Sequence, residues 1–294
     1  MRKGDAVAIS VARRRTNWAN RASWKTGLIH ALLWVYVVVT LYPLVWVLNS
    51  SFKANKEIIS NPWGLPLDFT WSNYLNAWKV GKISTYFFNS LYVSTIASVV
   101  TILFASATSY ALTRMQVKLP NTIIRALLLL ALLVPGGTLV LPLFVWIRDL
   151  HLYNTHLALI LPYITFGLPL TVFIVSAFMK AIPKELEEAG IVDGLTAFGL
   201  FWRLILPVTV PALVTVFILN FLSNWNEFVM AYLFLSKEKL RTLPTGMIAF
   251  MNQFNMNYGS LAASIMFSVA PVVVVYAFLQ EKIIEGVTAG SVKG

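Results

Sequence analysis

The chain has 294 residues, of which 58% are hydrophobic and 12% are charged, and its formal net charge is +11. Soluble domains carry about 25% charged residues, so this composition excludes an ordinary soluble protein and indicates an integral membrane protein. The chain contains no cysteine, which excludes a disulfide framework and a thiolate metal site. Because the basic residues lie between apolar runs, the charge indicates membrane topology and not nucleic-acid binding.

Six apolar runs are long enough to cross a lipid bilayer, which takes about 20 helical residues. They predict an all-α membrane protein with spans near 27–50, 87–112, 122–147, 157–179, 208–234 and 261–280. We therefore expect a basic N-terminal tail over 1–26, a six-helix transmembrane domain over 27–280 and a C-terminal tail over 281–294. The apolar core of the first run is too long for a signal peptide, so we expect it to remain as a span.

Lysine and arginine are divided unequally between alternate loops. One set of segments holds 15 of them, namely 1–26, 113–125, 180–207 and 281–294. The other set holds 8, in 51–86, 148–156 and 235–260. The positive-inside rule then predicts that both termini and the loop 180–207 lie in the cytoplasm, and an even number of spans agrees with that.

The loop 180–207 is predicted to form two short helices separated by a glycine break. Acidic residues open the first helix, where they favour the positive end of the helix dipole. Gly194 can adopt the left-handed conformation that ends a helix. Thr196 is placed to cap a second helix over 197–205, and Pro207 is expected to close it.

Four residues of this predicted second helix are too apolar for a solvated loop: Phe198, Phe201, Trp202 and Leu204. Such a patch must bury itself against another surface. The residues alone leave two alternatives open, a partner protein and a helix lying on the membrane surface.

The stretch from Glu187 to Pro207 resembles the EAA loop of bacterial ABC-type import permeases. The pattern of that loop is Glu-Ala-Ala, three residues, Gly, nine residues and Ile-x-Leu-Pro. Gly190 stands where the second alanine is usual, and Leu204 stands where isoleucine is usual. The resemblance assigns the coupling to an ATPase to Glu188, Ala189, Gly190, Asp193, Gly194, Leu206 and Pro207.

The resemblance covers roughly residues 27–294 and is closest to the carbohydrate-uptake branch, in particular to the smaller permease subunit of maltose-type systems. Besides the loop, three stretches carry it: Asn224-Trp225-Asn226-Glu227-Phe228, Thr242-Leu243-Pro244 and the tail from Gly286 to Gly294. It implies a type I ABC importer permease fold in a bacterial or archaeal plasma (inner) membrane.

The resemblance also implies the partners. They are a second homologous permease subunit, two copies of a cytoplasmic P-loop ATPase and an extracellular solute-binding protein that delivers a sugar. Glu188 is implied to make a polar contact in a cleft of the ATPase, and the C-terminal tail to reach the ATPase dimer interface. The chain itself has no G-x-x-x-x-G-K-[ST] phosphate loop. We therefore expect ATP and Mg to be bound by the partner and no enzymatic activity in this chain.

Glu227 is the one ionisable residue deep within the predicted spans, where a carboxylate is costly unless it is paired. It belongs to a polar group that we predict to form the substrate path or a gate: Asn220, Asn224, Trp225, Asn226 and Glu227. Amide and carboxylate groups bond sugar hydroxyls, and an indole ring stacks on a sugar face. Pairing across a subunit interface and closing an outer gate remain alternatives for Glu227.

Two other function classes fit the sequence less well. An ion-coupled secondary transporter needs carboxylates near mid-membrane, and Glu227 alone is thin support for such a site. A membrane-embedded enzyme needs catalytic groups that converge at one depth. His30, His151 and His156 show neither metal-ligand spacing nor a partner base, and we expect them to be structural.

Overall fold

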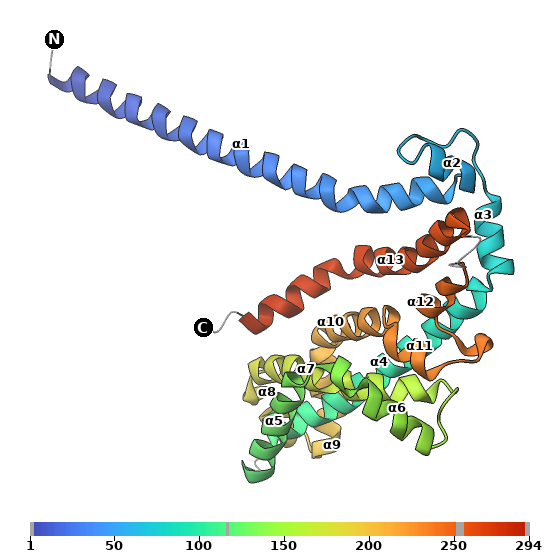
Figure 1. The fold of residues 1–294 in the computed structure, drawn as a ribbon. Coiled ribbons are helices and arrows are strands. Elements are labelled where there is room, and N and C mark those ends of the chain that lie inside the picture. The colour runs from blue at the N-terminus through green and yellow to red at the C-terminus, as the bar shows by residue number, and fades with distance from the viewer. Residues whose placement is uncertain (1–2, 116–117, 251–255, 292–294) are drawn as a thin grey trace.

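The computed structural model describes residues 3–115, 118–250 and 256–291, and the secondary structure within these ranges is helical (Figure 1). The longest helices are α1 (Lys3–Ser51), α4 (Ile83–Arg114), α5 (Lys118–Leu133), α7 (Leu157–Ala181), α10 (Leu206–Trp225) and α13 (Tyr258–Ser291). The shorter α-helices are α2 (Asn55–Ser60), α3 (Ser72–Leu75), α6 (Val140–Asp149), α8 (Lys184–Val192), α9 (Ala197–Leu200), α11 (Val229–Phe234) and α12 (Leu243–Gly246). The 3₁₀ and π turns are η1 (Asn76–Val80), η2 (Gly136–Leu139), η3 (Phe201–Ile205), η4 (Glu238–Leu240) and η5 (Met247–Phe250).

Five helical segments of the described chain are long and apolar enough to cross a membrane: Thr26–Ser51, Ile83–Arg114, Leu157–Ala181, Ala197–Trp225 and Tyr258–Phe278. A sixth span results if the bent pair Asn121–Leu133 and Gly136–Asp149 is counted as one. The predicted number of spans therefore agrees with the structure. The predicted tails continue the first and last spans as helix, from Lys3 into α1 and to Ser291 in α13, while 292–294 lie outside the described residues.

The third predicted span, 122–147, is wrong as a continuous helix. Its two halves meet at an angle of 90° at Pro135, whose backbone is extended with φ −63° and ψ 123°. Proline cannot donate a helical hydrogen bond and disfavours helical geometry in the residue before it. Gly136 and Gly137 follow at once and add freedom to the backbone, so the chain turns here and does not only kink.

The fifth predicted span, 208–234, is also wrong at both ends. The helical segment begins at Ala197 and stops at Trp225, and the chain becomes helical again only in α11. The break has a local cause, because the side chain of Glu227 accepts hydrogen bonds from the first N–H groups of α11. Those bonds favour a new helix start over continuation of α10.

Helices α4 and α7 form the centre of the bundle, and α10 packs on both. The middle of the buried face of α4 consists mainly of small residues, among them Ala97, Ser98, Ala105 and Ser109. Small side chains let membrane helices approach closely. Ser109 Oγ donates a hydrogen bond of 3.1 Å to the carbonyl oxygen of Val172 on α7, which a larger side chain would prevent.

The bundle has two ends, which we name the α8 end and the α11 end after the short helices there. One apolar cluster lies at the α8 end and includes Tyr110, Met179 and Phe201, and another lies at the α11 end and includes Val93 and Phe234. Helix α1 packs on α13 at the side of the bundle, and its span is exposed within this chain (Figure 1). Such apolar surface is suited to lipid or to other membrane helices.

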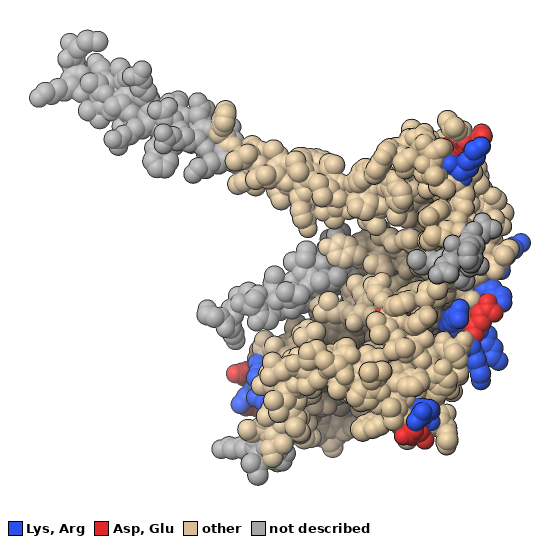
Figure 2. Space-filling view, in the orientation of Figure 1, with Lys and Arg blue, Asp and Glu red and all other residues tan. Residues whose placement is uncertain are grey.

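On the face shown in Figure 2, the charged side chains of the described residues gather at the two ends, and the surface between them is almost entirely uncharged. At the α11 end the loops are tied to α4 by polar contacts. Lys82 forms an ion pair of 2.8 Å with Glu238, and Asn89 donates hydrogen bonds to the carbonyl oxygens of Lys239 and Arg241. The hydrogen bond and charge of Lys82 hold the pKa of Glu238 below its ordinary value.

Candidate functional site

The first half of the loop 180–207 folds as its sequence predicts. Helix α8 ends at Val192, and Gly194 takes the left-handed conformation with φ +81°. The N–H of Gly194 bonds the carbonyl of Ile191, and the N–H of Leu195 bonds the carbonyl of Gly190, each at 2.9 Å. These bonds satisfy helix-end carbonyls in the manner of a glycine C-cap. The prediction for Gly194 is confirmed.

The second half begins as predicted and ends differently. The hydroxyl oxygen of Thr196 accepts a hydrogen bond of 3.3 Å from the N–H of Gly199, which confirms the predicted cap. Pro207 does not close the helix, because α9 passes through the π turn η3 into α10. Leu206 N–H bonds the carbonyl of Phe201, five residues earlier, so a π turn carries the helix past Pro207, which has no N–H to donate.

The exposed surface of the loop is the part that carries the pattern residues. Glu188, Ala189, Asp193 and Gly194 are exposed, whereas Gly190 is buried against Leu200. A Cβ at position 190 would lie 2.7 Å from the Leu200 side chain, which explains why glycine fits here. Of the predicted coupling residues, Glu188, Ala189, Asp193, Gly194 and Pro207 face outward, Leu206 is half-buried in the cluster at the α8 end, and Gly190 holds α8 on α9.

The apolar residues of the loop divide into two sets. Phe201 is buried and Leu204 is half-buried, and both pack in the cluster at the α8 end. Phe198 is 73% exposed and Trp202 is 44% exposed, and they join exposed Val192 on the outside of the loop. This outer set is apolar surface that nothing within the described chain covers.

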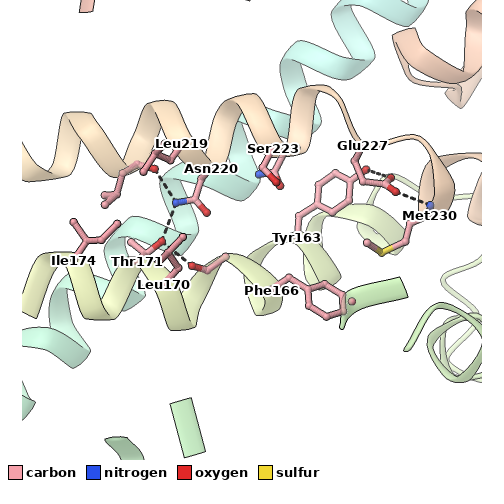
Figure 3. Close-up of a pocket in the computed structure, with 14 residues that line it drawn as sticks. Tyr163, Phe166, Leu170, Thr171, Ile174, Leu219, Asn220, Ser223, Glu227 and Met230 are labelled. Carbon is pink, nitrogen blue, oxygen red and sulfur yellow. Dashed lines mark hydrogen bonds between the residues drawn. The ribbon is translucent and has the colours of Figure 1, made fainter. Parts of the chain in front are cut away.

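A cavity of about 320 Å³ lies between α7 and α10 (Figure 3). Each helix contributes one face, with residues spaced three and four apart as on one side of a helix. The α7 face consists of Tyr163, Phe166, Gly167, Leu170, Thr171 and Ile174. The α10 face and its extension consist of Val216, Leu219, Asn220, Ser223, Asn224 and Glu227, and Gly136 and Met230 complete the lining.

Asn220 is the central polar group of this cavity. Its Nδ2 donates hydrogen bonds of 2.8 Å to the hydroxyl of Thr171 and to the carbonyl of Val216 (Figure 3). Gly167 lies against it so closely that a Cβ at that position would be 2.3 Å from Asn220 Oδ1. Asn224, one turn further along α10, donates a bond of 3.3 Å to Ser98 on α4. The polar face thus ties the three central helices together.

Glu227 lies in the break between α10 and α11, at the α11 end of the cavity. Its carboxylate accepts hydrogen bonds from Tyr163 Oη at 2.7 Å, Met230 N at 2.8 Å and Ala231 N at 3.0 Å. The prediction of an ionisable residue inside a span helix is therefore corrected, because the carboxylate sits at a helix N-terminus. That position supplies two N–H donors and a favourable dipole.

Two of the predicted path residues do not line the cavity. Trp225 is 1% exposed, with its ring stacked on Phe221 and set edge-on to Phe87. The indole has no free face for a sugar, so its predicted role as a stacking platform is corrected to that of a core residue. Asn226 points to the exposed side and bonds the carbonyl of Leu222. Both residues are turned away because they lie about 100° and 200° around the helix from Asn224.

The structure shows how the possible metal ligands and two of the histidines are placed. No group of three or more His, Cys, Asp or Glu close enough to hold a metal ion occurs in the part of the chain that the structure describes. His156 Nε2 lies 3.1 Å from the carbonyl oxygen of Leu240, and His30 Nδ1 lies 2.7 Å from that of Thr26. Both contacts are of the kind that structural histidines make.

Comparison with known proteins agrees with this arrangement. Residues 105–287 match the family described as the binding-protein-dependent transport system inner membrane component. The chain belongs to this family. The matched segment contains the loop 180–207 and every residue that lines the cavity. The protein is therefore a multi-pass inner membrane permease of the ABC importer class.

Relatives match over nearly the whole chain. A probable ABC transporter permease, YurM of Bacillus subtilis (strain 168), is 37% identical over 276 residues, which cover 93% of this chain and 91% of YurM. The diacetylchitobiose uptake system permease protein NgcG of Streptomyces coelicolor is 34% identical over 264 residues, covering 89% and 87%.

The fold matches a solved importer. A chain of a bacterial ABC transporter involved in import of the acidic polysaccharide alginate superposes with a TM-score of 0.77. The match covers 89% of this chain and 97% of that chain at 21% identity. This likeness establishes that the helices of this permease have the type I importer arrangement.

Sequence reasoning missed the α7 face of the cavity and a cation beneath the loop. Tyr163 and Thr171 bond the two predicted polar residues Glu227 and Asn220, and their spacing of eight residues puts them on one helical face. That spacing was the available signal. Arg114, the last residue of α4, contacts the loop at Glu187, and sequence spacing gives no indication of this contact.

Proposed function

We propose that this permease is one half of an ATP-driven importer for a sugar or oligosaccharide. In this assembly a second homologous permease completes the membrane path, two copies of a P-loop ATPase bind beneath it, and an extracellular solute-binding protein delivers the sugar. Sugar transport is supported by the relative NgcG, which is named for diacetylchitobiose uptake. Both termini and the loop 180–207 face the cytoplasm in this proposal, as the distribution of Lys and Arg predicts.

The observation that carries the proposal is the outer surface of the loop. Glu188 is exposed one helical turn before exposed Val192 on α8, and the second half of the same loop exposes the neighbouring rings of Phe198 and Trp202. Apolar surface of this kind marks a protein contact, and a charge at its edge fixes the orientation of the partner. The ATPase is the partner that an importer must bind on its cytoplasmic side, so we assign this surface to it.

The cavity between α7 and α10 is proposed as this subunit's share of the sugar path. Its polar groups are hydroxyls and amides, with the single carboxylate of Glu227 already bonded by protein donors. No cation lines it among the described residues. Such a lining suits hydroxyl groups of a neutral sugar better than the carboxylates of an acidic one.

Glu227 is proposed as a gate element and not as a principal sugar ligand. All three of its hydrogen bonds go to groups of the same chain, and they join α7 to the start of α11. An ion-coupled carrier would need carboxylates free to exchange an ion or proton. The bonding of Glu227 and the family of the chain both leave that alternative without support.

The assembly is tested by affinity purification of the chain from native membranes in mild detergent, with mass spectrometry of the proteins that accompany it. The proposal predicts a P-loop ATPase and a second permease-like chain. Recovery of this chain alone or as a homo-oligomer, under several detergents, would contradict the proposal. The second helix of the loop would then be interpreted as a helix that lies on the membrane surface.

A further inference from the structure

Arg114 is a buried cation at the point where α4, α7 and the loop 180–207 meet. Its side chain is 8% exposed. Nη2 donates hydrogen bonds to the carbonyl oxygens of Met179 at 2.6 Å and Ile182 at 2.9 Å. These carbonyls belong to the C-terminus of α7, where a helix concentrates negative partial charge and leaves acceptors unsatisfied. Arg114 therefore fastens the end of α4 to the end of α7.

Glu187 connects the same guanidinium to the loop. Its Oε1 lies 2.7 Å from Arg114 Nε, and its side chain is 16% exposed. Glu187 lies in the first turn of α8, immediately before the outward-facing Glu188. One arginine thus holds three helices through one ion pair and two hydrogen bonds, all shielded from solvent. Arginine suits this place because its planar fork reaches several acceptors at once.

Tyr110 makes the matching connection one turn earlier on α4. Its hydroxyl donates a bond of 3.2 Å to the carbonyl oxygen of Ala197, and its ring centroid lies 5.2 Å from that of Phe201. Helix α4 therefore contacts both halves of the loop, α8 through Arg114 and α9 through Tyr110.

We propose that Arg114 is a positioning residue that makes the loop 180–207 one rigid unit with α4 and α7. A force applied to α8 then moves α7 as well, because the contacts of Arg114 with Glu187 and with the end of α7 stay closed. The Tyr163–Ile174 face of α7 is one wall of the cavity. Two-state rearrangements of this kind need packed elements that move as bodies. The proposal rests on the coupling function proposed above, and it adds the contact through which movement of the loop reaches the path.

The first test measures sugar molecules transported per ATP hydrolysed, in proteoliposomes that hold the complete transporter with the subunits that copurify. Arg114→Gln is expected to lower this ratio at least tenfold, and Arg114→Lys, which keeps the charge but not the fork, is expected to recover part of it. Arg148→Gln is the matched control, because Arg148 is exposed and its ion pair within the described ranges is with its neighbour Asp149. A wild-type ratio in Arg114→Gln would overturn the proposal.

Glu187→Gln tests the Arg114–Glu187 ion pair in a chain that keeps the two hydrogen bonds from Arg114 to carbonyl oxygens and the shape of the side chain at position 187. We expect the ratio to fall at least threefold while the ATPase subunits still copurify, which a purely structural role would not produce. An unchanged ratio would overturn the proposal even if Arg114→Gln failed to assemble. A wild-type transporter without any ATP-dependent uptake would instead contradict the coupling function itself.

The absence of cysteine from the chain permits a direct test of rigidity. The double variant Arg114→Cys, Glu187→Cys can be bridged by a short bifunctional methanethiosulfonate, with the two single variants as controls. The proposal predicts a low transport-to-ATP ratio before bridging and recovery of at least threefold after it. If the bridge blocked transport, positions 114 and 187 would have to separate during the transport cycle, and the proposal of a rigid unit would be wrong.

Discussion

Tyr163 on α7 donates its hydroxyl hydrogen to Glu227 across the α11 end of the cavity, with 2.7 Å between Oη and Oε2. The same carboxylate accepts the N–H groups of Met230 and Ala231 at the start of α11. The pair therefore joins one cavity wall to the segment that follows the other. A change in the distance between α7 and α11 must break or re-form this contact, as expected for a gate.

Removing the Tyr163–Glu227 contact is expected to impair gating. Glu227→Gln removes the charge at the start of α11 and turns one acceptor into a donor. The change is expected to weaken the contacts of this side chain by about 1 kcal/mol, which is about fivefold in an equilibrium constant. Tyr163→Phe removes one bond only and is expected to have the smaller effect. The measurement is the rate of sugar uptake together with ATP hydrolysis in the absence of sugar. If both quantities stayed at wild-type values in Glu227→Gln, the contact would be incidental.

Charge reversal on the outer surface of the loop should separate the permease from its motor. Glu188→Lys is expected to reduce ATP-driven uptake to below about a tenth, since losing one partner of a charge pair that is buried in an interface typically costs about 2–5 kcal/mol. The protein should remain folded and inserted, because Glu188 is exposed in this chain.

The matched control for Glu188→Lys is Glu185→Lys, the same charge change at another exposed residue of α8. It is expected to retain most of the uptake. Normal uptake in Glu188→Lys, or an equal loss in both variants, would contradict a specific contact at Glu188.

The width of the cavity is set by Gly167. A methyl group there would lie 2.3 Å from Asn220 Oδ1 and 3.1 Å from Thr101 Cγ2, so Gly167→Ala forces Asn220 out of its bond to Thr171. Overpacking of this kind costs about 1–3 kcal/mol. We expect several-fold slower uptake.

Gly137→Ala is the control for Gly167→Ala, since no atom lies within 4 Å of the Cβ that it would add. Uptake rates and unfolding temperatures of the two variants check the prediction. Equal uptake by both variants would show that the α7–α10 cavity is not the path.

The left-handed conformation of Gly194 predicts a graded response to substitution. Gly194→Ala places a Cβ in a conformation that costs an L-residue about 1–2 kcal/mol, whereas asparagine tolerates it better. We expect uptake and the amount of copurifying ATPase to fall in the order glycine, asparagine, alanine. The reverse order for asparagine and alanine would argue against strain as the cause.

Trp225 should behave as a core residue and not as a sugar platform. Trp225→Phe loses the hydrogen bond from Nε1 to the carbonyl of Ser268 and part of the packing on Phe221. The expected result is a lower unfolding temperature with an unchanged KM for sugar uptake. A raised KM at unchanged stability would restore the stacking role.

The sequence predicted those parts of the fold that depend on local chemistry. The apolar runs located the spans, and Gly194 and Thr196 have the conformation and the cap expected of their side chains. The failures came at local bends, breaks and wide turns, which apolar runs and single prolines do not locate. Pro207 was expected to end a helix, but the π turn before it lets the helix continue into α10.

The candidate site shows the same division. Asn220, Asn224 and Glu227 share one helical face and line the cavity, whereas Trp225 and Asn226, which were predicted from their side-chain chemistry, do not line it. Helical spacing separates the two groups in advance. The contact between Arg114 and Glu187 joins residues 73 positions apart, and no periodicity within either segment predicts it.

The central claim is that ATP hydrolysed by a partner drives sugar through this permease. The most direct measurement is sugar uptake into proteoliposomes that contain the purified complex and its binding protein, with ATP supplied to the ATPase side and all ion gradients collapsed by ionophores. The account predicts uptake that requires ATP, persists without any gradient and is lost in Glu188→Lys. Uptake that follows an imposed proton or sodium gradient and ignores ATP would contradict it.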